Sequence, residues 1–345
     1  MEIAIWGAGA VGIGLASALA RPGTELCIIG RDPETLGALA REGIERFGLM
    51  GDVRIAPEAL RLESDAKVLA AAPPEWLLVC AKAHSSAAIA ATLEPIAATM
   101  EGRTRIVLCQ NGWGNETPFL SYWPRERLFH ARVITGFHRH RLHQVEITAH
   151  AAPIALGSLY DAPIECLEGL AEGLSSGGIP AEVRVDMESV LWAKMLYNCA
   201  LNPLGALTNR RYGELAGAEP TREIIGEVVA EIFAVLDRSG HRVDWADADS
   251  YLETFYSELI PPTAVHESSM LQDLRAGRQT EIESLCGAVE RLGEHHGVPT
   301  PVVSALARLV RAAEHRKYRQ QETGFPVGLR RWCGQPPTAL QLTYH

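Results

Sequence analysis

The stretch Glu2-Ile3-Ala4-Ile5-Trp6-Gly7-Ala8-Gly9-Ala10-Val11-Gly12 decides the fold, because it joins an apolar strand to a glycine-rich turn, and the helical pattern of residues 13–20 follows at once. Between a strand and a helix, the glycines of GxGxxG permit a tight turn, close approach of the backbone to a pyrophosphate and close packing of the helix on the strand. The alternative is a glycine-rich turn without a ligand. We expect a dinucleotide to bind at the six residues of this turn, Gly7, Ala8, Gly9, Ala10, Val11 and Gly12.

Further apolar runs predict the remaining parallel strands of an open sheet. They are residues 25–29, 75–82 and 104–112, with residues 51–56 as the best candidate for a third unit. The predicted fold class is therefore α/β, with an amino-terminal, doubly wound Rossmann-type sheet. Ligands bind at the carboxyl ends of such strands, so Lys82 and Asn111 are expected to face the same crevice as the glycine turn. For Lys82 the alternative is a strand-end lysine that reaches water.

The second strand ends in Gly30-Arg31-Asp32, which bears on the type of dinucleotide. A carboxylate near this point binds the ribose hydroxyls of NAD, whereas a guanidinium suits the 2′-phosphate of NADP. Arg31 is the reason to expect NADP(H). Asp32 stands beside it and keeps NAD as the alternative.

Residues 129–159 change to alternating β-like patterning, which predicts a small antiparallel addition to the first domain. This segment contains a cluster of histidines, and His138 with His140 would share one face of a strand. No acidic or cysteine partner stands at a spacing typical of zinc sites. We expect no metal site here.

Beyond residue 186 the patterning is almost wholly helical. The chain is therefore predicted to divide into three parts: residues 1–185, a cofactor-binding domain; residues 186–316, an all-α substrate domain; and residues 317–345, a tail punctuated by proline and glycine. Pairing of the helical domain into a homodimer is left open by the sequence.

The first helix of the second domain carries a polar stripe on an otherwise apolar surface. Lys194, Asn198 and Asn202 stand at i, i+4 and i+8, and so line one side of a helix over about 12 Å. Such a stripe is costly to bury unless a polar group faces it. A small anionic or carbonyl substrate would be such a group, whereas the alternative for Lys194 alone is a solvated lysine.

Composition narrows the class of partner. The 345 residues carry a formal charge of −10, which disfavours nucleic acid and acidic membrane surfaces. No apolar run is long enough to span a bilayer, and the seven cysteines form no CxxC pair. These features predict a cytoplasmic protein with a small-molecule partner and no disulfide framework.

A polar segment near the end of the helical domain, residues 268–283, is partly explained by helix capping. Ser269 with Gln272 and Thr280 with Glu283 have the spacing of capping boxes. Capping does not explain Glu281. We expect it in a first helical turn, where the helix dipole favours a carboxylate and where a ligand could also reach it.

Together these residues resemble the ketopantoate reductase (2-dehydropantoate 2-reductase) family. The resemblance covers residues 1 to about 312, and its specific part is Ser268-Ser269-Met270-Leu271-Gln272-Asp273 followed by Thr280-Glu281-Ile282. The remaining matches are GxGxxG, Lys82, Gln110-Asn111-Gly112, Lys194 with Asn198 and Asn202-Pro203, Tyr212-Gly213-Glu214-Leu215, and Gly277-Arg278.

The resemblance implies an active site in the cleft between the two domains. It implies that NADPH reduces 2-dehydropantoate to (R)-pantoate, a step towards pantothenate and coenzyme A, with Lys194 as the general acid. The other residues that it implies for substrate and cofactor are Glu281, Ser269, Asn198, Asn202 and Asn111. The chemistry of ketone reduction is consistent with this role for Lys194. Hydride transfer to the carbon leaves negative charge on the ketone oxygen, and a nearby ammonium stabilises that charge and then supplies the proton.

Two departures from the family pattern bear on the substrate. Tyr212 stands where the family often has a substrate-facing asparagine, and residues 136–140 replace a run that is commonly smaller. Reduction of a different 2-oxo acid therefore remains an alternative. A further alternative is a catalytically silent NADP-binding sensor, which would need neither Lys194 nor Glu281.

Overall fold

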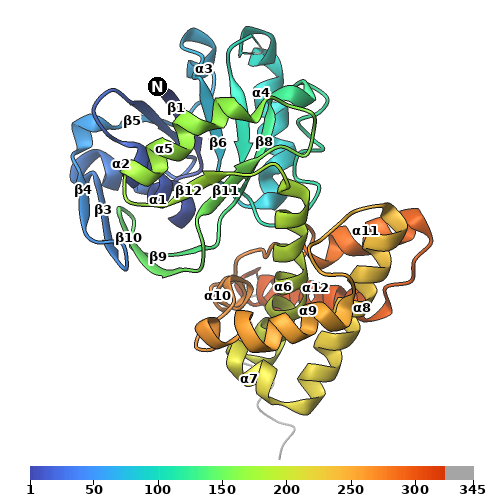
Figure 1. The fold of residues 1–345 in the computed structure, drawn as a ribbon. Coiled ribbons are helices and arrows are strands. Elements are labelled where there is room, and N and C mark those ends of the chain that lie inside the picture. The colour runs from blue at the N-terminus through green and yellow to red at the C-terminus, as the bar shows by residue number, and fades with distance from the viewer. Residues whose placement is uncertain (101, 323–345) are drawn as a thin grey trace, which may run out of the picture.

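The computed structural model describes residues 1–100 and 102–322, which form a lobe built on β-sheet and a helical lobe joined by α6 (Figure 1). The strands are β1 (Glu2–Trp6), β2 (Glu25–Ile29), β3 (Ile44–Gly48), β4 (Val53–Ile55), β5 (Arg61–Glu63), β6 (Trp76–Val79), β7 (Arg105–Leu108), β8 (Leu128–Arg132), β9 (Thr135–Arg141), β10 (Gln144–His150), β11 (Ile154–Gly157) and β12 (Ala181–Val183). The α-helices are α1 (Ala10–Leu19), α2 (Pro33–Glu42), α3 (Val68–Ala71), α4 (Ser86–Met100), α5 (Glu168–Ser176), α6 (Met187–Thr208), α7 (Tyr212–Gly217), α8 (Glu219–Ser239), α9 (Ala248–Thr254), α10 (Ser269–Arg275), α11 (Cys286–His296) and α12 (Pro301–Glu322).

The main sheet has the order β12-β11-β8-β7-β6-β1-β2-β5 and is parallel except where β11 runs antiparallel to β8. Helices cover both faces, as the apolar runs predicted. Along β1 the side chains alternate between two buried clusters, with Ile3 and Ile5 on one face and Ala4 and Trp6 on the other. The predicted α/β class with a Rossmann-type sheet and a helical second region is confirmed.

Residues 51–56 contain a strand as predicted, β4, but this strand does not belong to the main sheet. β4 belongs to a separate four-stranded sheet of order β4-β3-β10-β9, and β5 takes the edge position beside β2. β5 has only three residues and is mostly polar, so its sequence carries little strand signal. An edge strand needs less apolar surface than a central one, which explains why periodicity missed it.

The prediction of one antiparallel addition over residues 129–159 is also wrong in its arrangement. β8 continues the parallel sheet beside β7, and β11 pairs with β8, whereas the hairpin of β9 and β10 joins the smaller sheet. That smaller sheet packs on α1, where the ring of Phe137 leaves no room for a side chain at Gly14. Alternating hydrophobicity predicts strands but not their partners, because a half-buried hairpin such as this one, with Val145 and Ile147 buried and His138 exposed, can cover its apolar face against either sheet.

The helical lobe is organised around α6, which descends from the sheet into the centre of the other helices (Figure 1). Its first turn packs on Ala155 of β11, and its later turns lie in the core formed with α8, α10 and α12. The segment that follows α8 consists of α9 and a π-helical turn, η5 (Phe255–Leu259).

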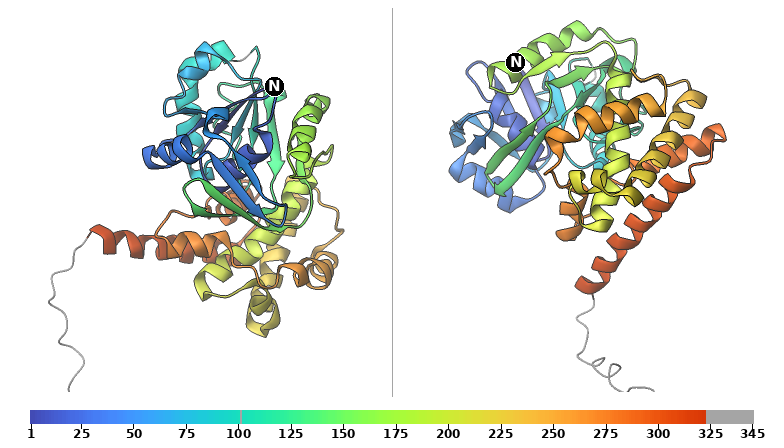
Figure 2. Two further views of the ribbon diagram at one scale, coloured as in Figure 1. Left: turned by 90° about the vertical axis from the view of Figure 1, so that its left-hand side faces the viewer. Right: turned by 60° about the horizontal axis from the view of Figure 1, so that its bottom comes forward.

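The last helix, α12, extends along one side of the helical lobe (Figure 2). It runs to Glu322, so it continues past the predicted start of the tail at residue 317, and residues 323–345 of that predicted tail lie outside the described residues. Over the part of the chain that is described, no helix combines the length and hydropathy needed to cross a bilayer.

Candidate active site

The carboxyl ends of four neighbouring strands meet at the edge of the sheet that faces the helical lobe. β1 leads into the glycine turn, β6 towards Lys82, β7 towards Asn111, and β8 ends at Arg132. Gly7 lies so close to the chain after β6 that a side chain there would meet the Ala81 nitrogen at 2.7 Å. The structure therefore brings the glycine turn and the predicted strand-end residues to the same edge of the sheet.

The glycine turn has the shape that a dinucleotide pyrophosphate requires. Gly7 has φ +115°, which is unfavourable for residues with a side chain, and a Cβ at Gly12 would lie 1.9 Å from the carbonyl oxygen of Gly7. Gly9 has open space where its Cβ would project, and it caps α1 without a side-chain hydrogen bond. The helix amino terminus thus keeps N–H groups available for an anion.

The two side chains after β2 have different surroundings. Asp32 caps α2 by accepting hydrogen bonds from the backbone N–H groups of Glu34 and Thr35, each at 3.2 Å. A further bond from the Thr35 hydroxyl is the main cause that lowers the pKa of Asp32. Arg31 is exposed beside it. The carboxylate is therefore engaged by its own helix, while the guanidinium projects from the strand end.

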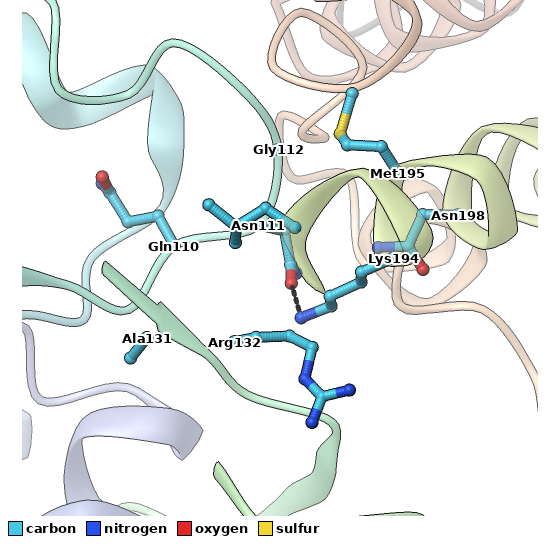
Figure 3. A pocket seen from close by; sticks show the side chains of 9 residues that line it. Gln110, Asn111, Gly112, Ala131, Arg132, Lys194, Met195 and Asn198 are labelled. Atoms are coloured by element: carbon cyan, nitrogen blue, oxygen red, sulfur yellow. Dashed lines mark hydrogen bonds between the residues drawn. The ribbon is translucent and has the colours of Figure 1, made fainter. Parts of the chain in front are cut away.

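Lys194 crosses from the helical lobe to the strand ends, as Figure 3 shows. Its ammonium donates to the side-chain oxygen Oδ1 of Asn111 at 2.6 Å and to the carbonyl oxygen of Val133 at 2.5 Å. It lines a pocket whose wall comes from β8, the end of β7 and α6. The lining residues are Gln110, Asn111, Gly112, Ala131, Arg132, Leu191, Lys194, Met195 and Asn198.

Burial lowers the pKa of Lys194 to about 8, because desolvation disfavours the ammonium. Nearby Glu281 raises this pKa and Arg132 lowers it, and both act less strongly than burial. A lysine with a pKa near 8 exchanges its proton readily near neutral pH. The arrangement is therefore suited to general acid–base chemistry on a substrate in the pocket.

Glu281 links the two lobes. Its carboxylate accepts hydrogen bonds from the backbone N–H of Ala83 at 3.2 Å and from Nδ2 of Asn111 at 3.0 Å, and it lies 3.5 Å from the Lys82 ammonium. Lys82 also pairs with Asp273 at 2.7 Å. Burial opposes the charge on Lys82, but the two carboxylates outweigh it, so the pKa of Lys82 is raised.

Asn111 stands at the centre of this network because its amide accepts from Lys194 and donates to Glu281. Four of the predicted site residues, drawn from both lobes, are thus connected through direct contacts. They are Lys82, Asn111, Lys194 and Glu281.

Of the three remaining predicted polar residues, only Asn198 lines the pocket. Asn198 lines the pocket one turn beyond Lys194, whereas Asn202 is buried, and its side-chain oxygen accepts a hydrogen bond from the Tyr212 hydroxyl at 2.7 Å. Burial raises the pKa of Tyr212, which keeps that hydroxyl protonated as a donor. Ser269 is exposed in the first turn of α10.

The capping predictions for this region are wrong in detail. Ser268, rather than Ser269, caps α10 by accepting from the backbone N–H of Leu271 at 3.0 Å. Thr280 accepts from the N–H of Ile282, but the next helix, α11, begins only at Cys286. Glu281 therefore lies in an irregular turn and not in a helix. Turn residues free of the helical repeat can direct a carboxylate towards the other lobe.

Two charged residues of the site were not singled out from the sequence. Asp273 holds Lys82 in place and also pairs with Arg278 at 2.9 Å. Arg132 lines the pocket at the carboxyl end of β8. The rule that selected Lys82 and Asn111 would also have selected Arg132 if residues 128–132 had been assigned to the parallel sheet.

The histidine segment lies away from the pocket. His140 pairs with Glu146 at 2.6 Å across the hairpin, and its ring contacts that of His138. Within the described ranges no group of three or more histidine, cysteine or acidic side chains is arranged to hold a metal ion.

Comparison with known proteins places the chain among oxidoreductases of one family. Residues 3–160 match the family model described as ketopantoate reductase PanE/ApbA, and residues 186–314 match its carboxy-terminal counterpart. The 2-dehydropantoate 2-reductase of Aquifex aeolicus is 31% identical over 318 residues, which is 91% of this chain and 97% of that protein. That of Mesorhizobium japonicum is 30% identical, over 90% of this chain and 97% of that protein.

Solved structures give the same result for the fold. A PanE/ApbA family ketopantoate reductase from Ralstonia eutropha superposes with a TM-score of 0.79 at 25% identity, covering 92% of this chain and all of that one. D-Mandelate dehydrogenase, solved with NADH and anilino(oxo)acetate, has a TM-score of 0.81 at 23% identity over 92% of this chain and 99% of its own. The chain belongs to the ketopantoate reductase family of oxidoreductases.

Proposed function

We propose that this protein reduces 2-dehydropantoate to (R)-pantoate with NADPH, a step in the formation of pantothenate and coenzyme A. The observation that carries the proposal is the contact of Lys194 with Asn111, which sets an ammonium of lowered pKa at the same edge of the sheet as the glycine turn. The relatives at 30% and 31% identity bear the name of this reaction. The domain division proposed is residues 1–185 for cofactor, residues 186–316 for substrate, and residues 317–345 as the tail.

The glycine turn fits a nicotinamide dinucleotide, whose reduced ring supplies the hydride when bound. Residues 7–12 would hold its pyrophosphate by backbone N–H groups, because Gly9 leaves open space and Gly12 admits no side chain. Lys82 and Glu281 would hold further polar groups of the cofactor where the two lobes meet.

The proposed chemistry of the chain rests on Lys194. As the ketone oxygen gains negative charge, the ammonium stabilises it and then transfers its proton to that oxygen. Asn111 orients the ammonium through its Oδ1 atom, and Glu281 fixes the amide of Asn111 from the opposite side. Asn198, Asn202 and Ser269 are the proposed contacts for the remaining polar groups of the substrate.

The proposal is tested by measuring oxidation of NADPH with a panel of 2-oxo acids that includes 2-dehydropantoate. We expect 2-dehydropantoate to have the highest kcat/KM. A competitor ahead by tenfold or more, about 1.4 kcal/mol in transition-state binding, would contradict the assignment. Cofactor binding without turnover of any 2-oxo acid would instead indicate a sensor.

A second candidate function is reduction of a different 2-oxo acid, as a D-2-hydroxyacid dehydrogenase. Tyr212 favours this candidate. Its hydroxyl donates a hydrogen bond to the side-chain oxygen of Asn202, so that oxygen has a partner within the protein and is not free to accept from a substrate. The same panel separates the two candidates. The Tyr212→Phe variant frees that oxygen, and a change in substrate ranking would show that the pair contributes to specificity.

The preference for NADP over NAD is proposed to come from Arg31. Replacement of Arg31 by Gln removes the guanidinium that would pair with the 2′-phosphate, so the KM for NADPH should rise about 10- to 100-fold. The KM for NADH should change by less than about threefold, since NADH lacks that phosphate.

The matched control is Arg41→Gln, which removes a guanidinium from the last turn of α2, at the far end of the helix that follows Arg31. Equal effects of Arg31→Gln on both cofactors would refute the assignment. A wild-type protein that prefers NADH would instead support the alternative, in which the carboxylate of Asp32 binds the ribose hydroxyls of NAD.

A further inference from the structure

Arg132 is a second cation in the pocket that holds Lys194. It ends β8, lines the same pocket as Lys194 and acts on the Lys194 ammonium through its charge, and Figure 3 draws its guanidinium directed away from Asn111 and Asn198. The two residues are linked through the backbone, because the Lys194 ammonium donates to the carbonyl of Val133, the residue after Arg132. Among the nine residues that line the pocket there is no carboxylate. The pocket wall is therefore net positive.

The guanidinium of Arg132 lacks a full set of partners. Its Nη2 atom donates to the carbonyl oxygen of Pro153 at 3.2 Å, and its Nε atom is buried without a hydrogen-bond partner among the described residues. A buried donor without an acceptor costs about 1–3 kcal/mol, and more when it is charged. An oxygen ligand in the pocket would remove that cost.

Neighbouring carboxylates are engaged elsewhere. Arg184 pairs with Asp186 at 2.5 Å and with Glu182 at 3.5 Å, so these two acids already have a cation. Among the described side chains, those of residues 1–100 and 102–315, no carboxylate forms an ion pair with Arg132 at 4 Å or less, and Glu182 and Asp186 act on it only at longer range. Burial of a guanidinium without an ion-pair partner is unfavourable, and an anionic ligand that binds to it would reduce that cost.

Lys194 has too few free donors to bind both the ketone oxygen and the carboxylate of a 2-oxo acid. Two of its three donors already bind Asn111 and Val133, which leaves one for the ketone oxygen. The carboxylate of a 2-oxo acid is bonded directly to the ketone carbon, so it lies close to Lys194, and a second cation at that point would stabilise it more strongly than neutral donors. A guanidinium suits it, because its planar fork can donate to both carboxylate oxygens.

We propose that Arg132 binds the carboxylate of the substrate and so restricts this enzyme to ketones with an adjacent carboxylate. The proposal rests on the proposed function, because it assumes that a 2-oxo acid enters this pocket. It assigns Arg132 to substrate binding, and leaves proton transfer to Lys194.

The test compares Arg132→Met and Arg132→Lys with the wild type on 2-dehydropantoate and on its uncharged amide. Loss of a hydrogen-bonded charge pair is expected to lower kcat/KM for the acid about 100-fold, mainly through KM. For the amide the change should be less than about threefold, since no carboxylate is present. Arg132→Lys should recover part of the activity on the acid.

The matched control is Arg127→Met. Arg127 precedes β8, is also half-buried, and also donates to a backbone carbonyl, that of Gly102 at 3.0 Å, yet it does not line the pocket. Removal of the Arg127 guanidinium should leave kcat/KM unchanged for both the acid and the amide. Equal losses on acid and amide with Arg132→Met, or no loss on the acid, would overturn the proposal, provided that the melting temperature confirms a folded variant.

A binding measurement separates this inference from the proposed function. Oxalate has two adjacent carboxylates and mimics a 2-oxo acid without reacting, so its affinity can be measured by calorimetry with NADP⁺ present. Wild type should bind oxalate, and Arg132→Met should weaken binding about 100-fold even if no 2-oxo acid is turned over. Unchanged oxalate affinity in Arg132→Met would overturn the role of Arg132, whatever the panel of substrates shows.

Discussion

Replacement of Lys194 by Met is expected to lower kcat/KM for 2-oxo acid reduction about 10³- to 10⁴-fold. The variant keeps the aliphatic stem that fills the pocket wall, but it removes both the charge proposed to stabilise the developing oxyanion and the proton proposed to complete the reaction. Asn111 also loses its ammonium partner at Oδ1. The measurement is steady-state oxidation of NADPH, with the affinity for NADPH determined separately by fluorescence titration. Cofactor affinity should remain within about threefold of the wild-type value, because Lys194 faces the substrate pocket.

The pH dependence gives a second measure of the same group. The pKa of Lys194 is lowered to about 8 mainly by burial, so the lysine is protonated below that pH and neutral above it. Reduction needs the ammonium, and kcat/KM should therefore fall as pH rises through about 8. Oxidation of the 2-hydroxy acid needs the neutral amine, and should rise through the same range.

The control variant is Lys67→Met, which removes an exposed lysine distant from the pocket. It should leave both rate and pH profile unchanged. Activity of Lys194→Met within tenfold of wild type, or a wild-type profile that is flat between pH 7 and about 9.5, would contradict the assignment of Lys194 as the acid.

Replacement of Gly12 by Ala is expected to disrupt the amino-terminal lobe itself. The added Cβ would lie 1.9 Å from the carbonyl oxygen of Gly7 and 3.3 Å from the side chain of Ile5, and the first of these atoms is backbone that cannot turn aside. Overpacking of this kind costs about 3 kcal/mol or more. We expect the melting temperature to fall by roughly 5–10 °C and cofactor binding to be lost.

Two other glycine variants separate packing from ligand binding. Gly9→Ala meets no atom within 4 Å and needs no change of backbone conformation, so it should preserve the melting temperature. It should nevertheless weaken NADPH binding, because its methyl group enters the space proposed for the pyrophosphate. Gly226→Ala, in an open position of α8, should affect neither property. A stable Gly12→Ala variant with normal cofactor affinity would contradict this account of the turn.

The parts of the fold that the sequence predicted correctly share a local signal. The run from Ile3 to Trp6 is apolar on both faces, and the glycines that follow meet a steric requirement of their own turn. Lys82 and Asn111 could be selected because each lies three residues after the last residue of such a strand, β6 or β7. These inferences need only a few consecutive residues and the rule that parallel strands end at one edge.

The errors arose where the partner of a segment is distant in sequence. β4 and β5 are both three residues long, and nothing in their own residues indicates which one pairs with β2. β8 was assigned to an antiparallel unit, which concealed Arg132 as a strand-end residue of the site.

The sequence by itself determined the dinucleotide-type turn, the parallel sheet, the helical second lobe and the lysine stripe of α6, because each depends on the backbone preferences and periodicity of adjacent residues. Only the tertiary structure decided that Glu281 reaches Asn111 across 170 positions and that Arg132 shares a pocket with Lys194. Such contacts depend on strand order and on how the two lobes pack. Those features minimise the free energy of the whole chain and are not encoded in any single segment.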